Sequence, residues 1–178
     1  MSPANEPPSG TRHPAGLPEA ALLAQVEESR HRASGPGGQR RNKVETAVRL
    51  RHLPTGLQAE ANERRSLEQN RSMALRRLRL RLALDVRVPV DVDTYEPSAL
   101  WVERTGGARL SVNERHADVP SLVAEALDVI VSCEDEASAA AACLGVTASR
   151  LLRVLRLEPA ALGAVNQRRS ARGIRGYR

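Results

Sequence analysis

The sequence contains very few aromatic residues. They make up 2% of its 178 residues: Trp101, Tyr95 and Tyr177 are present, and there is no phenylalanine. The hydrophobic content of 41% still supports a folded core, which must therefore be built from Leu, Val and Ala. Proteins that bind single-stranded nucleic acid without sequence preference stack the bases on aromatic side chains. The scarcity of aromatics argues against such a platform here.

Cysteine is also scarce. Cys133 and Cys143 lie in an Ala-rich stretch of helical character, and we expect buried free thiols in a reducing compartment. No metal and no cofactor is expected. Residues 1–19 are rich in Pro, Gly, Ser and Asn, which predicts disorder. They contain no apolar run typical of a secretory signal, and no stretch of the chain approaches the ~20 apolar residues of a membrane span. The expected location is the cytoplasm.

The net charge of +6 conceals a segregation of charge. Residues 30–81 carry a charge of +10, residues 82–160 carry −6, and residues 161–178 carry +5. An arginine-rich composition with solvated faces would explain part of the excess, but it explains the segregation poorly. Two basic regions separated by an acidic one indicate two contacts with a single polyanion.

The most informative stretch of the sequence runs from Ala33 to Val48. Three glycines and a proline occupy positions 35–38, and three basic residues follow at positions 40, 41 and 43. Glycine permits positive φ and lets the backbone approach a partner closely. A glycine-rich loop with basic neighbours is suited to an RNA backbone, to which it can present main-chain N–H donors. The alternative interpretation is an inert linker.

The same stretch resembles a known family. From Ser34 onwards it reads Ser-Gly-x-Gly-Gly-Gln-x-x-Asn-Lys-x-x-Thr-Ala-Val, and the similarity continues through Pro54-Thr55-Gly56, Glu63-Arg64-Arg65-Ser66 and Asn70-Arg71. This pattern resembles the signature of class I peptide chain release factors and their short relatives, over about residues 22–84. The family usually has a small residue, Asn or His and then Val after the Gln, where this chain has Arg40 and Arg41.

The resemblance implies a peptidyl-tRNA hydrolase that acts on the ribosome. The amide of Gln39 cannot titrate, so it is neither a general base nor a nucleophile. The loop must therefore act by positioning water and by stabilising developing charge with backbone N–H groups. The resemblance assigns catalysis to Gly37, Gly38 and Gln39, and support of the loop to Ser34, Gly35, Pro36, Asn42 and Thr46. It also implies rRNA of the peptidyl-transferase centre and peptidyl-tRNA as partners, a possible Gln methyltransferase, and a monomer.

The expected fold class is α+β, with a catalytic domain at residues 20–84. Val44–His52 alternates as a strand does, residues 54–56 make a turn, and Leu57–Ala61 returns as the second strand of a hairpin. Ser66-x-x-Gln69 is a capping box, which predicts a helix from about Leu67. The segment 20–26 is either a helical turn or the approach to a first strand.

Basic residues of this domain and of the C-terminus are candidate RNA contacts, although a solvated helix face would explain many of them. The candidates are Arg40, Arg41, Lys43, Arg64, Arg65, Arg71, Arg76, Arg77, Arg168, Arg169, Arg172, Arg175 and Arg178.

Beyond Leu84, prolines and alternating valines predict a linker with short strands over residues 85–117, including a strand at 109–113. A small helical domain is expected at residues 118–165, with helices that begin near Pro120, Asp135, Thr147 and Pro159. Residues 166–178 are predicted to form a basic tail that is broken by glycine and mobile.

Ala141, Gly145, Leu151 and Val154 have the spacing of a helix-turn-helix motif. Small helical bundles produce the same pattern, so both interpretations stay open. The second helix of this pair carries three arginines, at positions 150, 153 and 156, which leaves docking to RNA or protein possible.

Codon-reading release factors have a further large domain, for which 178 residues leave no room. The leading hypothesis is therefore a short hydrolase that releases nascent peptide independently of a stop codon. The alternatives are a non-catalytic ribosome- or RNA-binding module that keeps the fold, and a helix-turn-helix nucleic-acid-binding protein.

Overall fold

The computed structural model describes residues 13–31, 46–107 and 110–178. Within these ranges the chain forms seven α-helices and one three-stranded antiparallel sheet, so the predicted α+β class is confirmed. The elements in chain order are η1 (Pro14–Gly16), α1 (Glu19–Leu23), β1 (Val26–His31), β2 (Ala47–His52), β3 (Gln58–Ala61), α2 (Leu67–Asp85), α3 (Ala99–Thr105), α4 (Val119–Ser132), α5 (Ala137–Cys143), α6 (Ala148–Arg156) and α7 (Pro159–Ala171).

The sheet has the strand order β1-β2-β3. In β2, Val48 and Leu50 are buried while Arg49 and Arg51 are exposed, so the predicted alternation is confirmed. The turn before β3 is also confirmed, with Gly56 at a φ of 72°, a conformation that only glycine adopts readily. The undecided segment 20–26 contains most of α1 and the first residue of β1. Most of β1 is polar, so no apolar alternation marks it in the sequence.

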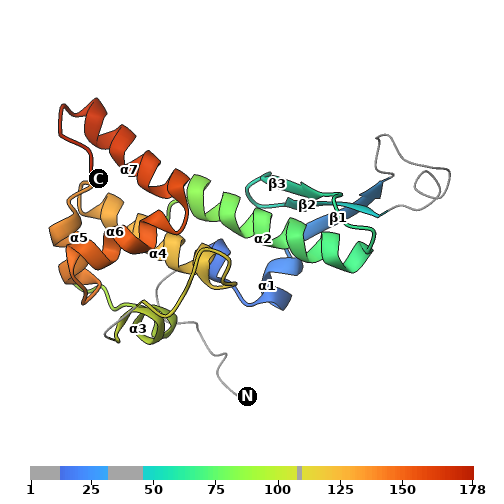
Figure 1. The fold of residues 1–178 in the computed structure, drawn as a ribbon, viewed down its shortest axis with the longest axis horizontal. Helices are drawn as coiled ribbons and strands as arrows, with labels where there is room; N and C mark the ends of the chain where they lie inside the picture. Colours follow the sequence, from blue (N-terminus) through green and yellow to red (C-terminus); the bar gives the residue numbers. More distant parts are fainter. Residues whose placement is uncertain (1–12, 32–45, 108–109) are drawn as a thin grey trace, which may run out of the picture.

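Helix α2 joins the two ends of the molecule (Figure 1). It begins as predicted, because the Ser66 side chain accepts a hydrogen bond from the Gln69 backbone N–H at 3.4 Å. Its buried residues Leu75 and Leu78 belong to the same continuous core as the sheet residues Val48 and Leu50. Towards its C-terminus α2 packs against α4. The sheet is therefore attached to the helical end through a shared core.

At the helical end, α4 packs against α5, α6 and α7 (Figure 1). The predicted starts of these helices are confirmed: Pro120 lies in the first turn of α4, the Thr147 side chain caps α6, and Pro159 opens α7. Gly145 follows α5 with a φ of 65°, the left-handed conformation that commonly ends a helix.

The segment between α2 and α4 was predicted wrongly in its secondary structure. It contains the helix α3 instead of short strands, and residues 110–113 form no strand. The Ser98 side chain caps α3 by accepting from the Trp101 backbone N–H at 3.0 Å. The Trp101 side chain is fully buried, and its indole N–H donates to the Leu144 carbonyl at 3.0 Å. Burial of this large side chain stabilises α3, although the nearby prolines and valines in the sequence do not predict a helix.

The described residues contain neither a cluster of metal ligands nor a single helix suited to span a membrane. Among the residues that the structure describes, no three His, Cys, Asp or Glu side chains gather as metal ligands would. No single described helix combines the length and apolar composition of a membrane span, although α5 and α6 together do so across a bend of 97°.

The two cysteines were predicted to be buried free thiols. The thiols of Cys133 and Cys143 are free but only half-buried, and their sulfur atoms lie 4.0 Å apart.

The ring of His13 attaches the N-terminal segment to the end of α2. Its Nε2 donates to the Val86 carbonyl at 3.1 Å, while Nδ1 accepts from the Ala15 backbone N–H at 3.0 Å. Both nitrogens are thus satisfied in the neutral ring, and a second proton on Nδ1 would displace the Ala15 bond. Burial lowers the pKa of His13 from its ordinary 6.5 to about 4.

We expect the free energy of unfolding to depend on His13 below neutral pH. Because the pKa of His13 is lower in the folded state, its contribution is complete above pH 6.5 and is lost as the pH falls towards 4. The loss is at most about 1.4 kcal/mol per pH unit. In urea unfolding, the free energy of unfolding of the wild type should exceed that of His13→Ala by an amount that decreases as the pH falls from 6.5 to 4. A difference that is constant from pH 7 to pH 4 would contradict this expectation.

Candidate nucleic-acid interface

The predicted catalytic stretch connects β1 to β2. Gly37, Gly38 and Gln39, the supporting Ser34, Gly35, Pro36 and Asn42, and the basic Arg40, Arg41 and Lys43 all lie outside the described residues, so their roles remain predictions. The two ends of the stretch are described. His31 and Ala47 are paired across the antiparallel strands β1 and β2. The strands therefore hold the entry and the exit of the stretch side by side.

Asn70 braces the exit of this stretch. It is fully buried in the first turns of α2, and its Nδ2 donates to the Thr46 carbonyl at 2.6 Å and to the Arg64 carbonyl at 2.8 Å. Its Oδ1 accepts from the Arg64 backbone N–H at 2.9 Å. One amide thus joins the residue before β2, the segment before α2 and α2 itself. Thr46, predicted as a loop support, takes part through its backbone carbonyl.

Three glutamates neutralise part of the basic surface around the sheet. Glu28 pairs with Arg71 at 2.7 Å, Glu60 pairs with Arg49 at 3.0 Å, and Glu63 pairs with Arg77 at 2.6 Å. These contacts lower the pKa of each carboxyl group; the hydrogen bond from the basic partner is the main cause for Glu28 and Glu63, and a hydrogen bond from His31 is the main cause for Glu60. Two predicted RNA contacts, Arg71 and Arg77, are therefore already paired with acids.

The predicted contacts differ in how free their side chains are. The guanidinium of Arg76 donates to the Glu114 carbonyl at 2.6 Å. The side chains of Arg64 and Arg65 are exposed and make no ion pair or hydrogen bond with any other described residue. They precede α2, beside the Asn70 brace. The structure therefore brings Arg64 and Arg65 close to the exit of the catalytic stretch, with their charges available.

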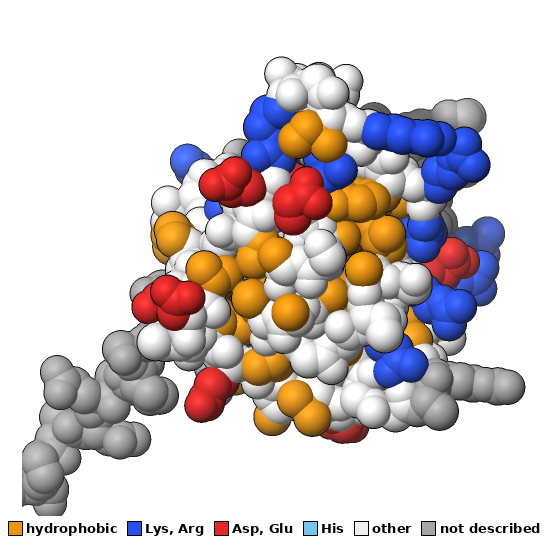
Figure 2. All heavy atoms as spheres, turned by 90° about the vertical axis from the view of Figure 1, so that its left-hand side faces the viewer, with side chains coloured by type: hydrophobic (Ala, Val, Ile, Leu, Met, Phe, Trp, Pro, Cys, Tyr) orange, Lys and Arg blue, Asp and Glu red, His pale blue; other side chains and the backbone are white. Residues whose placement is uncertain are grey.

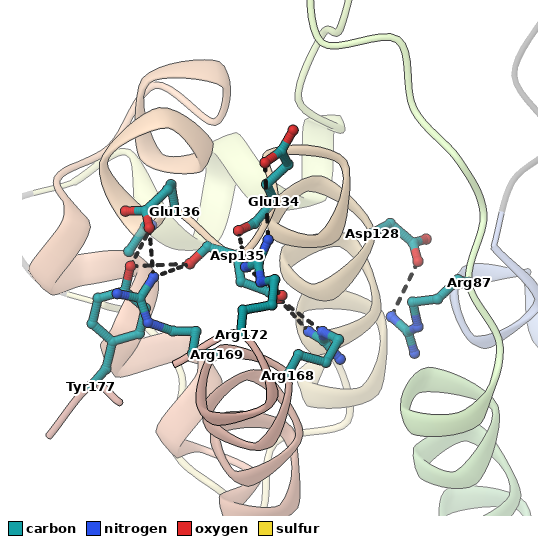
Figure 3. A network of polar contacts seen from close by, with 10 residues as sticks. Arg87, Asp128, Glu134, Asp135, Glu136, Arg168, Arg169, Arg172 and Tyr177 are labelled. Carbon is teal, nitrogen blue, oxygen red and sulfur yellow. Dashed lines mark hydrogen bonds and ion pairs between the residues drawn. The ribbon is translucent and has the colours of Figure 1, made fainter. Parts of the chain in front are cut away.

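The C-terminal arginines follow a different pattern from the one predicted. Helix α7 continues to Ala171, so residues 166–171 are helical rather than an irregular tail. Three predicted RNA contacts, Arg168, Arg169 and Arg172, point into a network with the acidic turn between α4 and α5 (Figure 3). Arg169 is only 6% exposed. The sequence could not show this, because the partners lie more than 30 positions away.

Asp135 is the centre of this network. Its carboxylate pairs with Arg168 at 2.8 Å and with Arg172 at 3.2 Å, and its carbonyl accepts from Arg169 at 2.7 Å (Figure 3). Arg169 also pairs with Glu136 at 2.8 Å and lies over the ring of Tyr177, 4.1 Å from its centroid. The chain end is thus held against α5, and these three arginines have a structural role.

Tyr177 offers a test of this attachment. Its hydroxyl accepts from the Ala137 backbone N–H at 2.9 Å and donates to the Asp135 carbonyl at 3.1 Å. Tyr177→Phe keeps the ring under Arg169 and removes both bonds, so we expect the free energy of unfolding to fall by about 1–2 kcal/mol. Arg178→Ala, at an exposed position of the same segment, is the control and should change it by less than about 0.5 kcal/mol. Equal stabilities for wild type and Tyr177→Phe in urea unfolding would rule out the docked end.

The remaining C-terminal candidates, Arg175 and Arg178, are exposed, and their side chains make no ion pair with any described residue. Figure 2 faces the helical end of the molecule and shows hydrophobic side chains across its middle, with basic side chains along the upper and right-hand edges. On this face, the basic side chains therefore lie around the hydrophobic centre rather than within it.

Sequence reasoning did not identify Asn70 or the three glutamates as parts of the site. A signal for Asn70 exists: with Ala74 and Leu78 it lies at four-residue spacing on the buried stripe of α2, where a polar residue must satisfy its hydrogen bonds internally. No such signal exists for Glu28, whose partner Arg71 is 43 positions away.

Comparison with known proteins finds a family match for the region that contains the sheet. The RF-1 domain model matches residues 23–98. The chain is 47% identical over 68 residues to the chloroplastic peptide chain release factor PrfB1 of Arabidopsis thaliana, covering 35% of this chain and 15% of that protein. It is 49% identical over 56 residues to peptide chain release factor 2 of Variovorax paradoxus, covering 32% and 15%. It is 53% identical over 49 residues to peptide chain release factor 1 of Geobacter metallireducens, covering 28% and 14%.

The chain thus spans about 15% of the length of these relatives. The matched residues include β1, β2, β3 and α2, whereas α4 to α7 lie outside the RF-1 match.

Proposed function

We propose that this chain, whose residues 23–98 match the RF-1 domain, is a member of the class I peptide chain release factor family and releases nascent peptide on the ribosome by hydrolysing the ester of peptidyl-tRNA. The match over residues 23–98 carries this proposal, since it includes the Gly-Gly-Gln stretch and the scaffold that holds its ends. The proposed partners are the ribosome, with rRNA of its peptidyl-transferase centre, and peptidyl-tRNA. We propose that the chain acts as a monomer in the cytoplasm.

In the proposed reaction, water attacks the ester carbonyl carbon, the bond from that carbon to the ribose oxygen breaks, and a proton lost by the water is transferred to the leaving ribose oxygen. The backbone N–H of Gln39 donates to the oxygen that gains negative charge, and such donors act most strongly when they are positioned beforehand. The Gln39 side chain restricts access to the ester, and it is the proposed target of a Gln methyltransferase. Residues 33–43 contain no Cys, His, Asp or Glu that could act as a base, so in this proposal the ribosome completes the site.

The described residues support this proposal through positioning. The β1–β2 pairing and the Asn70 brace fix both ends of the catalytic stretch, and a displacement of 1 Å can cost about 100-fold in rate. Arg64 and Arg65 supply charge beside its exit for rRNA or tRNA phosphates, which attract basic side chains without sequence preference. The proposed catalytic domain is residues 20–84, and the proposed helical domain is residues 118–165.

We further propose that release does not require a stop codon, as in the short members that the sequence resembles. Release of labelled peptide should therefore be similar from ribosomes with a stop codon, a sense codon or an empty A site. The same assay with peptide chain release factor 1, which should respond to its stop codons, is the positive control. A strong requirement for a stop codon in this chain would contradict codon independence while leaving peptide release itself intact.

A non-catalytic ribosome-binding role is the second candidate. The observation that favours it is the Arg40-Arg41 pair directly after Gln39, because two long charged side chains stand where smaller or neutral ones are usual. Ribosome binding without peptide release in any of these three complexes would support this second role.

A further inference from the structure

Helices α5 and α6 meet in the geometry of a helix-turn-helix. Their axes differ by 97°, within the roughly 90–120° of that motif. Four residues, Leu144 to Thr147, connect them. Gly145 at a φ of 65° makes the turn, and the Thr147 side chain caps α6 by accepting from the Arg150 backbone N–H at 3.2 Å. The spacing seen in the sequence therefore corresponds to a real perpendicular helix pair.

The interior of this unit contains the residues that the motif requires to be apolar. Ala141 of α5 and Leu151 and Val154 of α6 are at most 2% exposed, and α4 packs against both helices. These contacts form a three-helix core from α4, α5 and α6. Arg150 leans away from the outer face of α6 and donates to the carbonyls of Thr105 and Gly107, which ties α6 to the end of α3.

The outer face of α6 is polar and basic. Ser149, Arg153 and Arg156 are exposed, together with the capping residue Thr147. Arg153 and Arg156 lie one turn apart and form no ion pair with any residue in the described ranges. Arg168 and Arg169 in the neighbouring α7, and Arg172 directly after it, are paired with acids instead. The folded chain therefore neutralises Arg168, Arg169 and Arg172 and leaves Arg153 and Arg156 of α6 available.

We infer that α4, α5 and α6 form a DNA-binding unit whose helix α6 enters the major groove of a double helix. The major groove of B-form DNA is about 12 Å wide and admits an α-helix. The deep, narrow major groove of an A-form RNA duplex does not. In this arrangement Arg153 and Arg156 contact phosphates or guanine edges, and the hydroxyl of Ser149 reaches a base edge or phosphate.

The surrounding charge limits how this unit can bind. Residues 82–160 carry a net charge of −6, and Glu158 lies two residues after the end of α6. Binding that depended on phosphate attraction alone would be weak, because acidic neighbours repel the backbone. The inference therefore requires that α6 recognises sequence, with contacts to bases adding to those of the two arginines.

The test uses the full chain and a duplex DNA library with a randomised centre. Repeated selection with the wild type should enrich a short sequence motif, and the enriched duplex can then be titrated by fluorescence anisotropy. Arg153→Ala/Arg156→Ala should bind this duplex at least about ten-fold more weakly, and the slope of log K against log salt should fall by roughly 2. Both positions are exposed, so circular dichroism should show an unchanged fold.

Arg175→Ala/Arg178→Ala is the matched control, because it removes the same charge from exposed positions outside α6. It should retain the selected motif. The inference is overturned if no motif is enriched, if the two double variants weaken binding equally, or if a duplex RNA of the same sequence binds as well as the DNA. Peptide release by Arg153→Ala/Arg156→Ala at saturating protein should equal that of the wild type, which separates this inference from the proposed function.

Discussion

Gln39→Ala is expected to lower the rate of peptide release by about 100-fold or more, an effect of the size seen when a positioned group is lost from a transition state. The substitution lies in the stretch between β1 and β2, so the core and the arginines that we propose to contact the ribosome are unchanged. Affinity for the ribosome should therefore stay within about two-fold, because the change removes no charge. Single-turnover release and a sedimentation assay with purified ribosomes measure the two quantities separately.

Gln167→Ala is the matched control for this substitution. Gln167 is exposed on α7, so the same chemical change outside the RF-1 match should leave release at the wild-type rate. Gly38→Ala should resemble Gln39→Ala, since it adds a Cβ where we propose that the backbone approaches the ester closely. Wild-type release by both Gln39→Ala and Gly38→Ala would remove this stretch from the mechanism.

Asn70→Ala is expected to lower the free energy of unfolding by about 3 kcal/mol, because it leaves buried partners of three hydrogen bonds without their amide. These partners are the Thr46 carbonyl and the backbone N–H and carbonyl of Arg64. Release should fall as well at temperatures where the variant is folded, since the exit of the catalytic stretch loses its attachment to α2. Urea unfolding and single-turnover release measure these effects.

Asn62→Ala provides the comparison. Asn62 is exposed directly after β3, and an alanine there should change the free energy of unfolding by less than about 0.5 kcal/mol. Asn70→Asp keeps the acceptor for Arg64 and loses both donated bonds, so its stability should also be below that of the wild type. Equal unfolding midpoints for Asn70→Ala and Asn62→Ala would show that the brace contributes nothing.

Elements with local signals could be predicted from the sequence. The β2–β3 hairpin has alternating side chains and a Gly56 turn, and α2 has its Ser66 cap. The starts of α4, α6 and α7 are marked by Pro120, Thr147 and Pro159. In each case the determining contact is within a few residues, so the pattern alone predicts the structure.

Elements determined by distant contacts could not be predicted. Helix α3 depends on burial of Trp101, whose indole N–H donates to the carbonyl of Leu144, 43 positions away. The C-terminal end of α7 and the docked Tyr177 depend on Asp135, which neither composition nor periodicity relates to them. The same limit applied to the site: 13 basic residues were candidate RNA contacts, and only the folded chain shows which are paired with acids.

Peptidyl-tRNA hydrolysis by this chain is tested by single-turnover release of labelled peptide from purified ribosomes with an empty A site. Wild-type protein at saturating concentration should release the peptide far faster than the spontaneous reaction, and Gln39→Ala should bind the same ribosomes with little release. If the wild type binds but releases peptide only at the spontaneous rate, peptidyl-tRNA hydrolysis by this chain is contradicted.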